Sequence, residues 1–205
     1  MNKKKGFFLT FEGPEASGKS SQIKLLEKFL KNQKIPYHIT REPGGTNLAE
    51  SLRSLILRKN SNINIEEEIL MLMAARSHHI NQVIKPAIEK GKIVISDRFA
   101  DSTFVYQGYV NKYGIKNTIK LHKDLLNNFL PKKTFLFKLS TKNILKRLKK
   151  RKSKNKYDKL DKKFHDDVNK GYSIIYNNKR FINIDASKSI TYIHKKIIDH
   201  LNFLI

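Results

Sequence analysis

Short apolar runs alternate along the chain with longer stretches in which apolar residues recur at helical spacing. The short runs predict strands at residues 6–11, 37–40, 92–96, 134–139 and 181–184. The longer stretches predict helices at residues 20–33, 47–57, 66–90, 141–151, 164–178 and 189–203. Thr141 is the expected N-cap of the helix that it precedes. Strands that alternate with helices favour an α/β fold, in which a five-stranded parallel sheet carries helices on both faces.

Length and composition are typical of one folded domain spanning residues 1–205. Hydrophobic residues make up 39% of the 205, enough to build a sizeable core. The absence of cysteine excludes a disulfide scaffold, a thiolate zinc site and a cysteine nucleophile. The apolar runs are too short to cross a bilayer, and Glu12 interrupts what would be the core of a signal peptide. We therefore expect a cytoplasmic protein with no membrane partner.

The strong positive charge has two possible readings. The chain holds 42 basic and 18 acidic residues, a formal net charge of +24, which raises nucleic-acid binding as an option. Lysine supplies 34 of the 42, as an A/T-rich coding sequence would do at exposed positions. Residues 132–163 alone hold 15 basic and 2 acidic residues, so the excess is local. A local basic segment suits a bound polyphosphate or a solvated helix face, and we do not expect a nucleic-acid partner.

A phosphate-binding loop follows the first predicted strand. Its residues match G-x-x-x-x-G-K-[ST] at every fixed position and lie directly before a predicted helix. In such a loop, backbone N–H groups converge on phosphate oxygens. Lys19 would lie between the β- and γ-phosphates, and the Ser20 hydroxyl would bind Mg²⁺. The predicted ATP site consists of Gly13, Pro14, Glu15, Ala16, Ser17, Gly18, Lys19 and Ser20.

More polar residues follow the second and third predicted strands, at the sheet edge where ligands bind in parallel α/β folds. Arg41 follows the second strand, and Asp97 and Arg98 follow the third. Arg76 lies on an otherwise apolar helix face, where an arginine is costly to bury without a partner. Each arginine alone could form a surface ion pair, but together they favour an anionic second ligand beside the phosphate loop. Nearby candidates are Arg53, Ser102, Tyr106 and Gln107.

In chain order, these motifs resemble those of the thymidylate kinase family of nucleoside monophosphate kinases. The matching segments, which span nearly the whole chain, are Phe11-Glu-Gly13 through Lys19-Ser20, Arg41-Glu-Pro-Gly-Gly-Thr46, Leu52-Arg53-Ser-Leu55, Ala74-Ala-Arg76, Ile84-Lys-Pro-Ala87, Asp97-Arg98, Ser102-Thr103, Tyr106-Gln107-Gly108, Phe164-His165, Val168, Gly171-Tyr172 and Ile184-Asp-Ala186. The resemblance implies the P-loop nucleoside monophosphate kinase fold and a homodimer packed through helices. It also implies the reaction ATP + dTMP → ADP + dTDP with Mg²⁺, a step in dTTP biosynthesis.

The resemblance also implies roles on the acceptor side. Arg53 and Arg98 would hold the acceptor phosphate, each able to grip it with two hydrogen bonds. Glu15 would meet the deoxyribose hydroxyl or the metal shell. Asp97 would anchor Mg²⁺ through water or orient Arg98. Arg41, Ser102 and Tyr172 are further expected substrate-binding residues.

The resemblance also implies which residues surround the thymine base. Arg76 and Gln107 would read the edge of the base, and Tyr106 would crowd the position of a ribose 2′-hydroxyl. The family usually places phenylalanine four residues before the arginine, to stack on the ring. Here this residue is Leu72, which can pack on a base but lacks an aromatic face, so Phe104 is a possible substitute.

The phosphate loop contains no arginine, so the cation that stabilises the transferring phosphoryl group must come from elsewhere. The basic segment resembles the lid of the bacterial subtype, at about residues 147–160. With Lys19 and Arg98, the lid residues Arg147 and Arg151 are the expected catalytic residues. The family carries Asp-Arg where the ungapped match places Asn155-Lys156, and lysine lacks the planar fork of arginine.

Three histidines carry little chemistry in this interpretation. His78, His79 and His165 have no partners at metal-ligand spacing, and we expect them on helix surfaces.

Two alternatives remain open. One is a P-loop kinase for another small acceptor, although a nucleoside without a phosphate would not need both Arg53 and Arg98. The other is a nucleic-acid-binding ATPase, favoured only by the net charge.

Overall fold

A five-stranded parallel sheet forms the centre of the computed structural model, which describes residues 6–58, 62–150 and 160–204. The strands lie in the order β2-β3-β1-β4-β5. Their bounds are β1 (Phe7–Glu12), β2 (Tyr37–Arg41), β3 (Ile93–Asp97), β4 (Lys133–Lys138) and β5 (Phe181–Asp185). β1 pairs with β3 on one side and with β4 on the other. The predicted fold class is confirmed.

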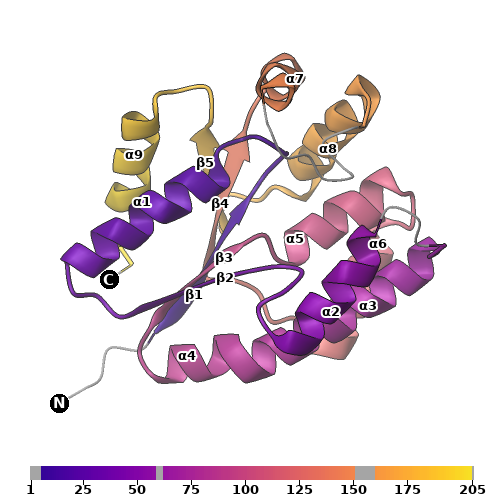
Figure 1. The fold of residues 1–205 in the computed structure, drawn as a ribbon, viewed down its shortest axis with the longest axis horizontal. Helices are drawn as coiled ribbons and strands as arrows, with labels where there is room; N and C mark the ends of the chain where they lie inside the picture. The colour runs from indigo at the N-terminus through magenta and orange to yellow at the C-terminus, as the bar shows by residue number, and fades with distance from the viewer. Residues whose placement is uncertain (1–5, 59–61, 151–159, 205) are drawn as a thin grey trace.

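Helices cover both faces of the sheet (Figure 1). One face carries α1 (Lys19–Asn32) and α9 (Ile190–Asn202), which contact each other. The other elements of the described chain lie on the opposite face and around the upper edge. They are α2 (Asn47–Leu57), α3 (Ile65–His79), α4 (Lys85–Glu89), α5 (Ala100–Thr103), α6 (Ile115–Leu126), α7 (Thr141–Lys149) and α8 (Lys162–Ile175), with two π-helical segments, η1 (Ile80–Ile84) and η2 (Phe104–Val110).

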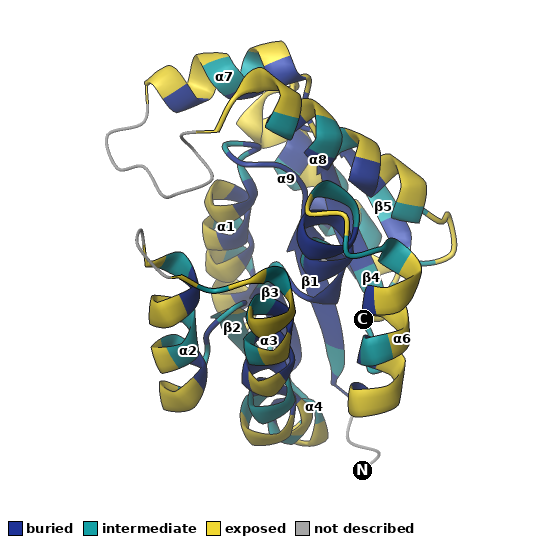
Figure 2. Ribbon diagram, turned by 90° about the vertical axis from the view of Figure 1, so that its right-hand side faces the viewer, coloured by how far each residue is buried: buried dark blue, intermediate teal, exposed yellow. Residues whose placement is uncertain are grey.

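The core follows from the two-residue periodicity of the strands. Leu9 and Phe11 of β1 pack toward α1 and α9, while Phe8 packs toward α3 and α4. β1 is the middle strand of a sheet with helices on both faces, so both of its faces are buried and four of its six residues are apolar. Figure 2 shows the sheet as a buried layer enclosed by helices with exposed outer sides. Within the described residues, no helix is both long and apolar enough to cross a membrane.

The helix predicted at residues 66–90 is interrupted by a wider turn. α3 passes into η1 and then into α4, which has Pro86 in its first turn. Proline has no N–H, and its ring crowds the carbonyl four residues earlier, so a π-helical turn relieves the clash. The expected cap at Thr141 is wrong by one residue. The side chain of Ser140 accepts the bond from the Asn143 N–H, and Thr141 is the first helical residue.

Parallel pairing brings the functional segments to one edge of the sheet. Asp97 at the end of β3 lies in register with Phe11 of β1 and Arg41 of β2. The phosphate loop, the loop after β2 and the segment after β3 therefore start side by side. This edge is where an open parallel sheet binds its ligands.

Candidate active site

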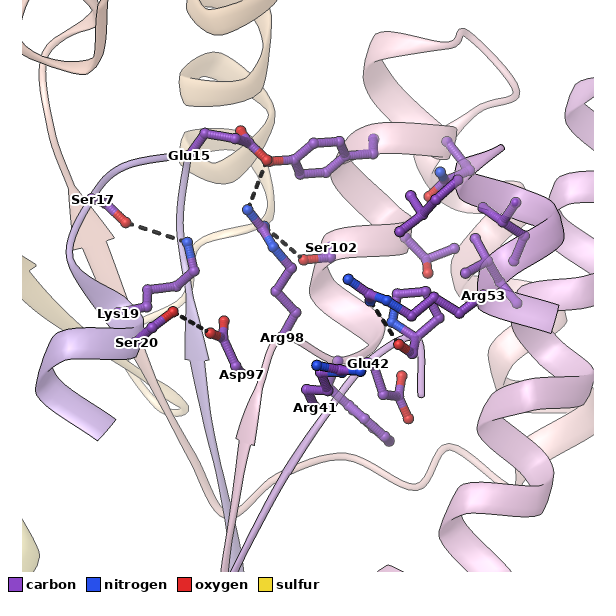
Figure 3. Close-up of a pocket in the computed structure, with 18 of the residues that line it drawn as sticks. Glu15, Ser17, Lys19, Ser20, Arg41, Glu42, Arg53, Asp97, Arg98 and Ser102 are labelled. Atoms are coloured by element: carbon purple, nitrogen blue, oxygen red, sulfur yellow. Dashed lines mark hydrogen bonds and ion pairs between the residues drawn. The ribbon is translucent and has the colours of Figure 1, made fainter. Parts of the chain in front are cut away.

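One cavity of about 620 Å³ opens at this edge, between the phosphate loop, α2, α3 and α5 (Figure 3). Most of the residues predicted for the site line it. They are Glu15, Ala16, Ser17, Gly18, Lys19, Ser20, Arg41, Arg53, Leu72, Arg76, Asp97, Arg98, Ser102, Tyr106, Gln107 and Arg147. Pro14 and Tyr172 line a second cavity of about 430 Å³ on the other side of the loop, and Gly13 lines neither.

Backbone geometry explains the glycines of the phosphate loop. Gly13 has φ +135°, and a Cβ there would lie 2.4 Å from the carbonyl oxygen of Phe137, so only glycine fits. Gly18 has φ +96° just before α1, a left-handed conformation that side chains disfavour. The loop therefore turns tightly between β1 and the N-terminus of α1. That helix end is an anion-binding position.

Lys19 folds back over the loop. Its Nζ donates to the carbonyl oxygens of Gly13 and Pro14, at 3.0 and 2.8 Å, and lies 3.3 Å from Ser17 Oγ. Burial, and then the nearby Arg98 charge, lower the pKa of Lys19 to about 8. The ammonium is thus largely charged at neutral pH, but the neutral carbonyl oxygens that it contacts do not fully offset the cost of burying its charge. A phosphate oxygen would supply that compensation.

Ser20 and Asp97 meet on the floor of the cavity. Ser20 Oγ donates to Asp97 Oδ2 at 2.8 Å, which joins the first turn of α1 to the end of β3. A hydroxyl and a carboxylate are hard oxygen ligands of the kind that Mg²⁺ prefers. The described residues contain no cluster of three or more histidine, cysteine or acidic side chains that could hold a metal. A Mg²⁺ ion at this position would therefore need nucleotide phosphates to complete its coordination, as is common for this ion.

Arg98 is fixed from two sides. Its Nη2 donates to Glu15 Oε1 at 2.9 Å, and its Nη1 donates to Ser102 Oγ at 3.1 Å and to Tyr172 Oη at 3.2 Å. The Tyr106 hydroxyl donates to both Glu15 oxygens at 2.8 Å. These contacts join five of the predicted site residues into one network. Tyr172 thus reaches the site through Arg98, although it does not line the cavity.

Arg41 and Arg53 flank the loop after β2. Arg41 pairs with Glu50 at 2.9 Å, with both side chains well exposed. Arg53 Nη1 donates to the Pro43 carbonyl oxygen at 2.7 Å. Burial and the Arg41 charge lower the pKa of Arg53, so this part of the cavity favours an anion.

Arg76 is buried and is held by Glu42. Its Nε donates to Glu42 Oε2 at 2.7 Å, and its Nη2 donates to Thr103 Oγ1 at 2.8 Å. His79, also buried, bonds to the other Glu42 oxygen at 2.9 Å and to Thr40 Oγ1 at 2.7 Å. The plane of the Arg76 guanidinium is therefore fixed at the wall of the cavity.

The expected surface positions of the histidines are wrong for His79 and His165, which are both fully buried. A histidine on a helix face is buried wherever that face meets another layer, and the helical pattern alone did not show this. His78 is partly buried and contacts Thr46 Oγ1 at 3.0 Å.

Leu72 lines the cavity as expected, but Phe104 does not. Phe104 is buried in the core on the second face of the sheet, edge-on to His122. The phenylalanine that lines the cavity, beside Tyr106, is Phe99, whose ring lies 5.2 Å from the Arg76 guanidinium. Phe104 begins η2, and sequence spacing could not predict that its side chain is buried in the core.

Arg147 reaches the phosphate loop from α7. Its Nη1 donates to the Ala16 carbonyl oxygen at 3.2 Å, and its Nη2 donates to that of Ala186 at 2.8 Å. The predicted catalytic Arg151 and most of the predicted lid at 147–160, including Asn155-Lys156, lie outside the described residues.

Comparison with known proteins agrees with this geometry. The sequence matches the family profile described as thymidylate kinase over residues 11–197. The chain belongs to the thymidylate kinase family. The family activity therefore applies to it: it is a nucleoside monophosphate kinase that transfers a phosphoryl group from ATP to dTMP, giving dTDP.

Individual thymidylate kinases match along almost their whole length. A thymidylate kinase of Thermoanaerobacter sp. (strain X514) is 38% identical over 200 residues, which cover 95% of this chain and 97% of that protein. A thymidylate kinase of Rickettsia bellii (strain OSU 85-389) is 39% identical over 205 residues, with 98% of each chain covered. A crystal structure of thymidylate kinase from Ehrlichia chaffeensis superposes with a TM-score of 0.76 at 31% identity, covering 97% of this chain and 99% of that one. The agreement between fold and sequence supports the P-loop nucleoside monophosphate kinase fold.

Sequence reasoning missed three buried acids, two of which hold predicted site residues in place. Glu12 bonds to Ser102 and Tyr172, and Glu42 to Arg76, as their distances show. Asp101 forms a two-armed ion pair with Arg180 at 2.6 and 2.7 Å. The available signal was an acid at the end of an apolar strand or in an apolar helix, where an unpartnered charge would be costly.

Proposed function

We propose that the 620 Å³ cavity binds the phosphates of ATP and the whole of dTMP side by side, and that the named residues divide into a donor and an acceptor side. The observation that carries this proposal is the arrangement of cations. Lys19 lies on the phosphate loop, while Arg98 and Arg53 face it across one open cavity. Transfer between two phosphates requires positive charge on both sides of the moving group.

The donor side consists of the phosphate loop from Gly13 to Ser20. Oxygens of the β- and γ-phosphates would replace the loop carbonyls that now bind Lys19 Nζ. Ser20 and Asp97 would hold Mg²⁺, which, when bound, withdraws charge from the phosphate oxygens. Arg147 would approach the transferring group from the loop that it already contacts, with Arg151 as the second lid cation.

The acceptor side places the phosphate of dTMP between Arg53 and Arg98. Arg98 has its guanidinium fixed by Glu15, Ser102 and Tyr172, so little entropy is lost when it binds an oxygen. Arg41, at the mouth of the cavity, adds to the positive potential. The positioning of these groups, rather than acid–base chemistry, is the main contribution that the protein makes to phosphoryl transfer.

The base would lie against Leu72 and Phe99. Gln107 donates from Nε2 to Glu68 Oε1 at 2.6 Å, which directs its carbonyl oxygen to the other side of the amide. That oxygen can accept the thymine N–H, and the Arg76 guanidinium can donate to a ring carbonyl. Tyr106 is fixed on Glu15 and would fill the space beside C2′, which favours deoxyribose.

The molecule would work as a cytoplasmic homodimer with no nucleic-acid or membrane partner. Large apolar side chains exposed on α2 and α3 support an interface between helices.

An ADP-release assay with Mg-ATP and a panel of acceptors tests the proposal. The panel is dTMP, dUMP, UMP, CMP, AMP, GMP, thymidine and single-stranded DNA. We expect turnover to be fastest with dTMP, lower with dUMP and absent with thymidine. Turnover with another monophosphate and none with dTMP would contradict the assigned acceptor, and stimulation by DNA alone would contradict the kinase assignment.

A further inference from the structure

Glu12 is a fully buried acid at the end of β1 with every oxygen in use. Its Oε1 accepts the backbone N–H of Phe99 at 2.7 Å. Its Oε2 accepts the hydroxyl of Ser102 at 2.7 Å and that of Tyr172 at 2.8 Å. A buried carboxylate is costly even with these bonds, so a neutral side chain would be the cheaper choice if only packing mattered.

The two hydroxyls continue the chain of hydrogen bonds to Arg98. Arg98 Nη1 donates to Ser102 Oγ at 3.1 Å and to Tyr172 Oη at 3.2 Å. A guanidinium can only donate and an ionised carboxylate can only accept. Each hydroxyl must therefore point its hydrogen at Glu12 and its lone pair at Arg98. The charge on Glu12 sets the direction of both bonds.

Glu12 also supports the backbone of Arg98. Arg98 has φ +69°, a left-handed conformation that is strained for a residue with a side chain. The Arg98 N–H donates to the Phe11 carbonyl oxygen at 3.0 Å, and Ser96 Oγ donates to the Arg98 carbonyl oxygen at 2.7 Å. The next N–H along the chain, that of Phe99, is the one that Glu12 accepts.

We propose that Glu12 is a positioning residue for the phosphoryl acceptor, acting through Ser102 and Tyr172 to hold the Arg98 guanidinium toward the acceptor phosphate. The proposal rests on the proposed role of Arg98. Glu15 anchors the other arm of the same guanidinium, so Glu12 and Glu15 together leave Arg98 one orientation.

Protonation of Glu12 would reverse the direction of at least one hydrogen bond between Glu12 and the two hydroxyls. Burial, and then the Asp101 charge, raise the pKa of Glu12 to about 7, while Arg98, Ser102 and Tyr172 act in the opposite direction. Lys19 is a further charge that interacts with it, and Asp101 is itself paired with Arg180. The Phe99 N–H on Oε1 can only donate, so the added proton is favoured on Oε2, where at least one of the two hydroxyls must turn to accept it. The hold on Arg98 is therefore expected to weaken as the pH falls through about 7.

Glu12→Gln reproduces the uncharged state with nearly the same shape. We would measure KM for dTMP and for ATP separately between pH 6 and 9. We expect the dTMP KM of the variant to be about 10-fold above wild type at pH 8.5, with the ATP KM within about twofold. The ratio of the two dTMP KM values should fall toward 1 at pH 6, where wild-type Glu12 is itself protonated. Titration of the dTMP phosphate affects both proteins equally and cancels in this ratio.

Glu27→Gln, on α1 and outside the cavity, is the matched control and should leave both KM values unchanged. An equal rise in the KM of ATP and of dTMP, or a dTMP KM ratio that does not depend on pH, would overturn the positioning role. A general loss of structure is distinguishable from a positioning effect, because it lowers the fraction of active enzyme and leaves both KM values unchanged.

Tyr172→Phe provides a second route should Glu12→Gln not fold. It keeps the acid but removes one relay hydroxyl, and it should raise the dTMP KM by about threefold. A dTMP KM equal to wild type would contradict the inference. Calorimetric titration of dTMP into wild type and the Gln variant separates the two proposals. Equal affinities at pH 8.5 overturn the role of Glu12 alone, whereas no binding to wild type overturns both this role and the proposed acceptor.

Discussion

Arg53 shows at the residue scale how the free protein prepares its acceptor side. One arm of the guanidinium already bonds to the Pro43 carbonyl oxygen, and this contact aims the remaining donors into the cavity. Arg41 lies close enough to lower the pKa of Arg53 further, and the nearby carboxylates of Glu50 and Asp97 offset this lowering only in part. Repulsion of this kind is relieved when a phosphate binds, which contributes to affinity.

Replacement of Arg53 by lysine keeps the charge and removes the planar fork. One lysine ammonium cannot bond to Pro43 and grip a phosphate with two parallel bonds, so we expect the KM for dTMP to rise about 10- to 100-fold. The ATP KM should change by less than about threefold, because Lys19 holds the donor phosphates. Steady-state kinetics with each substrate varied in turn would measure both. Arg58→Lys, at the end of the same helix and outside the cavity, serves as the control.

Which site residues could be predicted depended on how each one acts. The phosphate loop and the arginines act on ligands, and the ligand chemistry dictates residue type and spacing, so sequence motifs revealed them. Glu12 and Glu42 act on other side chains. Their partners come from 90 and 34 residues away, and no local pattern encodes such a distance.

At the element scale, the segment from α5 through η2 carries much of the acceptor side and is anchored by one ion pair. Asp101 is fully buried, and Arg180, just before β5, bonds to both of its oxygens. Arg180 also donates to Thr134 Oγ1 at 2.8 Å, which ties β4 into the same cluster. The pair therefore attaches α5, which lines the cavity, to the strands β4 and β5 at one edge of the sheet.

Removing one partner of this ion pair should lower the stability of the protein more than replacing both partners together. Arg180→Met leaves the buried Asp101 charge without a partner, and we expect the free energy of unfolding to fall by about 3–5 kcal/mol. Asp101→Asn alone should also destabilise, whereas the double variant should lose less than the sum of the two single losses. Urea unfolding of the four proteins completes the cycle. Additive losses would show that the two side chains do not interact.

α6, which follows η2, contains a buried histidine that makes stability depend on pH. His122 Nε2 lies 2.8 Å from the Phe129 carbonyl oxygen, and burial, followed by the Arg76 charge, lowers its pKa to about 4. The folded protein thus binds this proton less readily than the unfolded chain, whose histidine has a pKa of about 6.5. The stabilisation is complete above about pH 6.5 and is lost as the pH falls toward 4.

His122→Gln keeps a donor for Phe129 and removes the titration. We expect wild type to exceed this variant in unfolding free energy at pH 7, and the gap to narrow by about 2–3 kcal/mol at pH 4.5. Since all other groups titrate in both proteins, the difference isolates His122. A gap that stays constant across this range would mean that His122 is not held neutral.

The elements between residues 100 and 126 were also the part of the fold that the sequence did not predict. Gly108 and Gly114 interrupt the apolar pattern, and η2 has a wider turn than an α-helix, so no single period fits. Packing supplies the reason for one of these glycines. A Cβ at Gly108 would lie 2.7 Å from Thr118 Oγ1, so α6 can approach η2 only at glycine. Strands and long amphipathic helices carry their own periodicity and were predicted to within a few residues.

On the scale of the whole molecule, α2 and α3 present large apolar side chains to solvent. Leu48 and Leu55 are 47% and 46% exposed, and Leu70 is 61% exposed. The two helices contact each other, so these residues belong to one part of the surface. Such a surface is costly for a monomer and suits an isologous contact between two copies.

Leu70→Glu should therefore shift the proposed homodimer toward monomer. A carboxylate on this surface would be desolvated without a partner in both copies of the proposed dimer, which we expect to weaken it at least 100-fold. Sedimentation velocity over a concentration series would measure the shift. Ile190→Glu, an equally exposed position at the start of α9, should leave the dimer intact. A wild-type protein that sediments as a monomer at all concentrations would refute the interface.

The central position of β1 has a consequence for how the chain is made. β1 leaves the ribosome first, yet its two neighbours begin at residues 93 and 133, so neither edge can be paired early. At about 5–20 residues per second, these edges wait for roughly 5–25 seconds. During that time four large apolar side chains, Phe7, Phe8, Leu9 and Phe11, have no sheet to enter. The strand that will carry the phosphate loop is thus also an apolar segment of the nascent chain that needs shielding from aggregation until its neighbours are made.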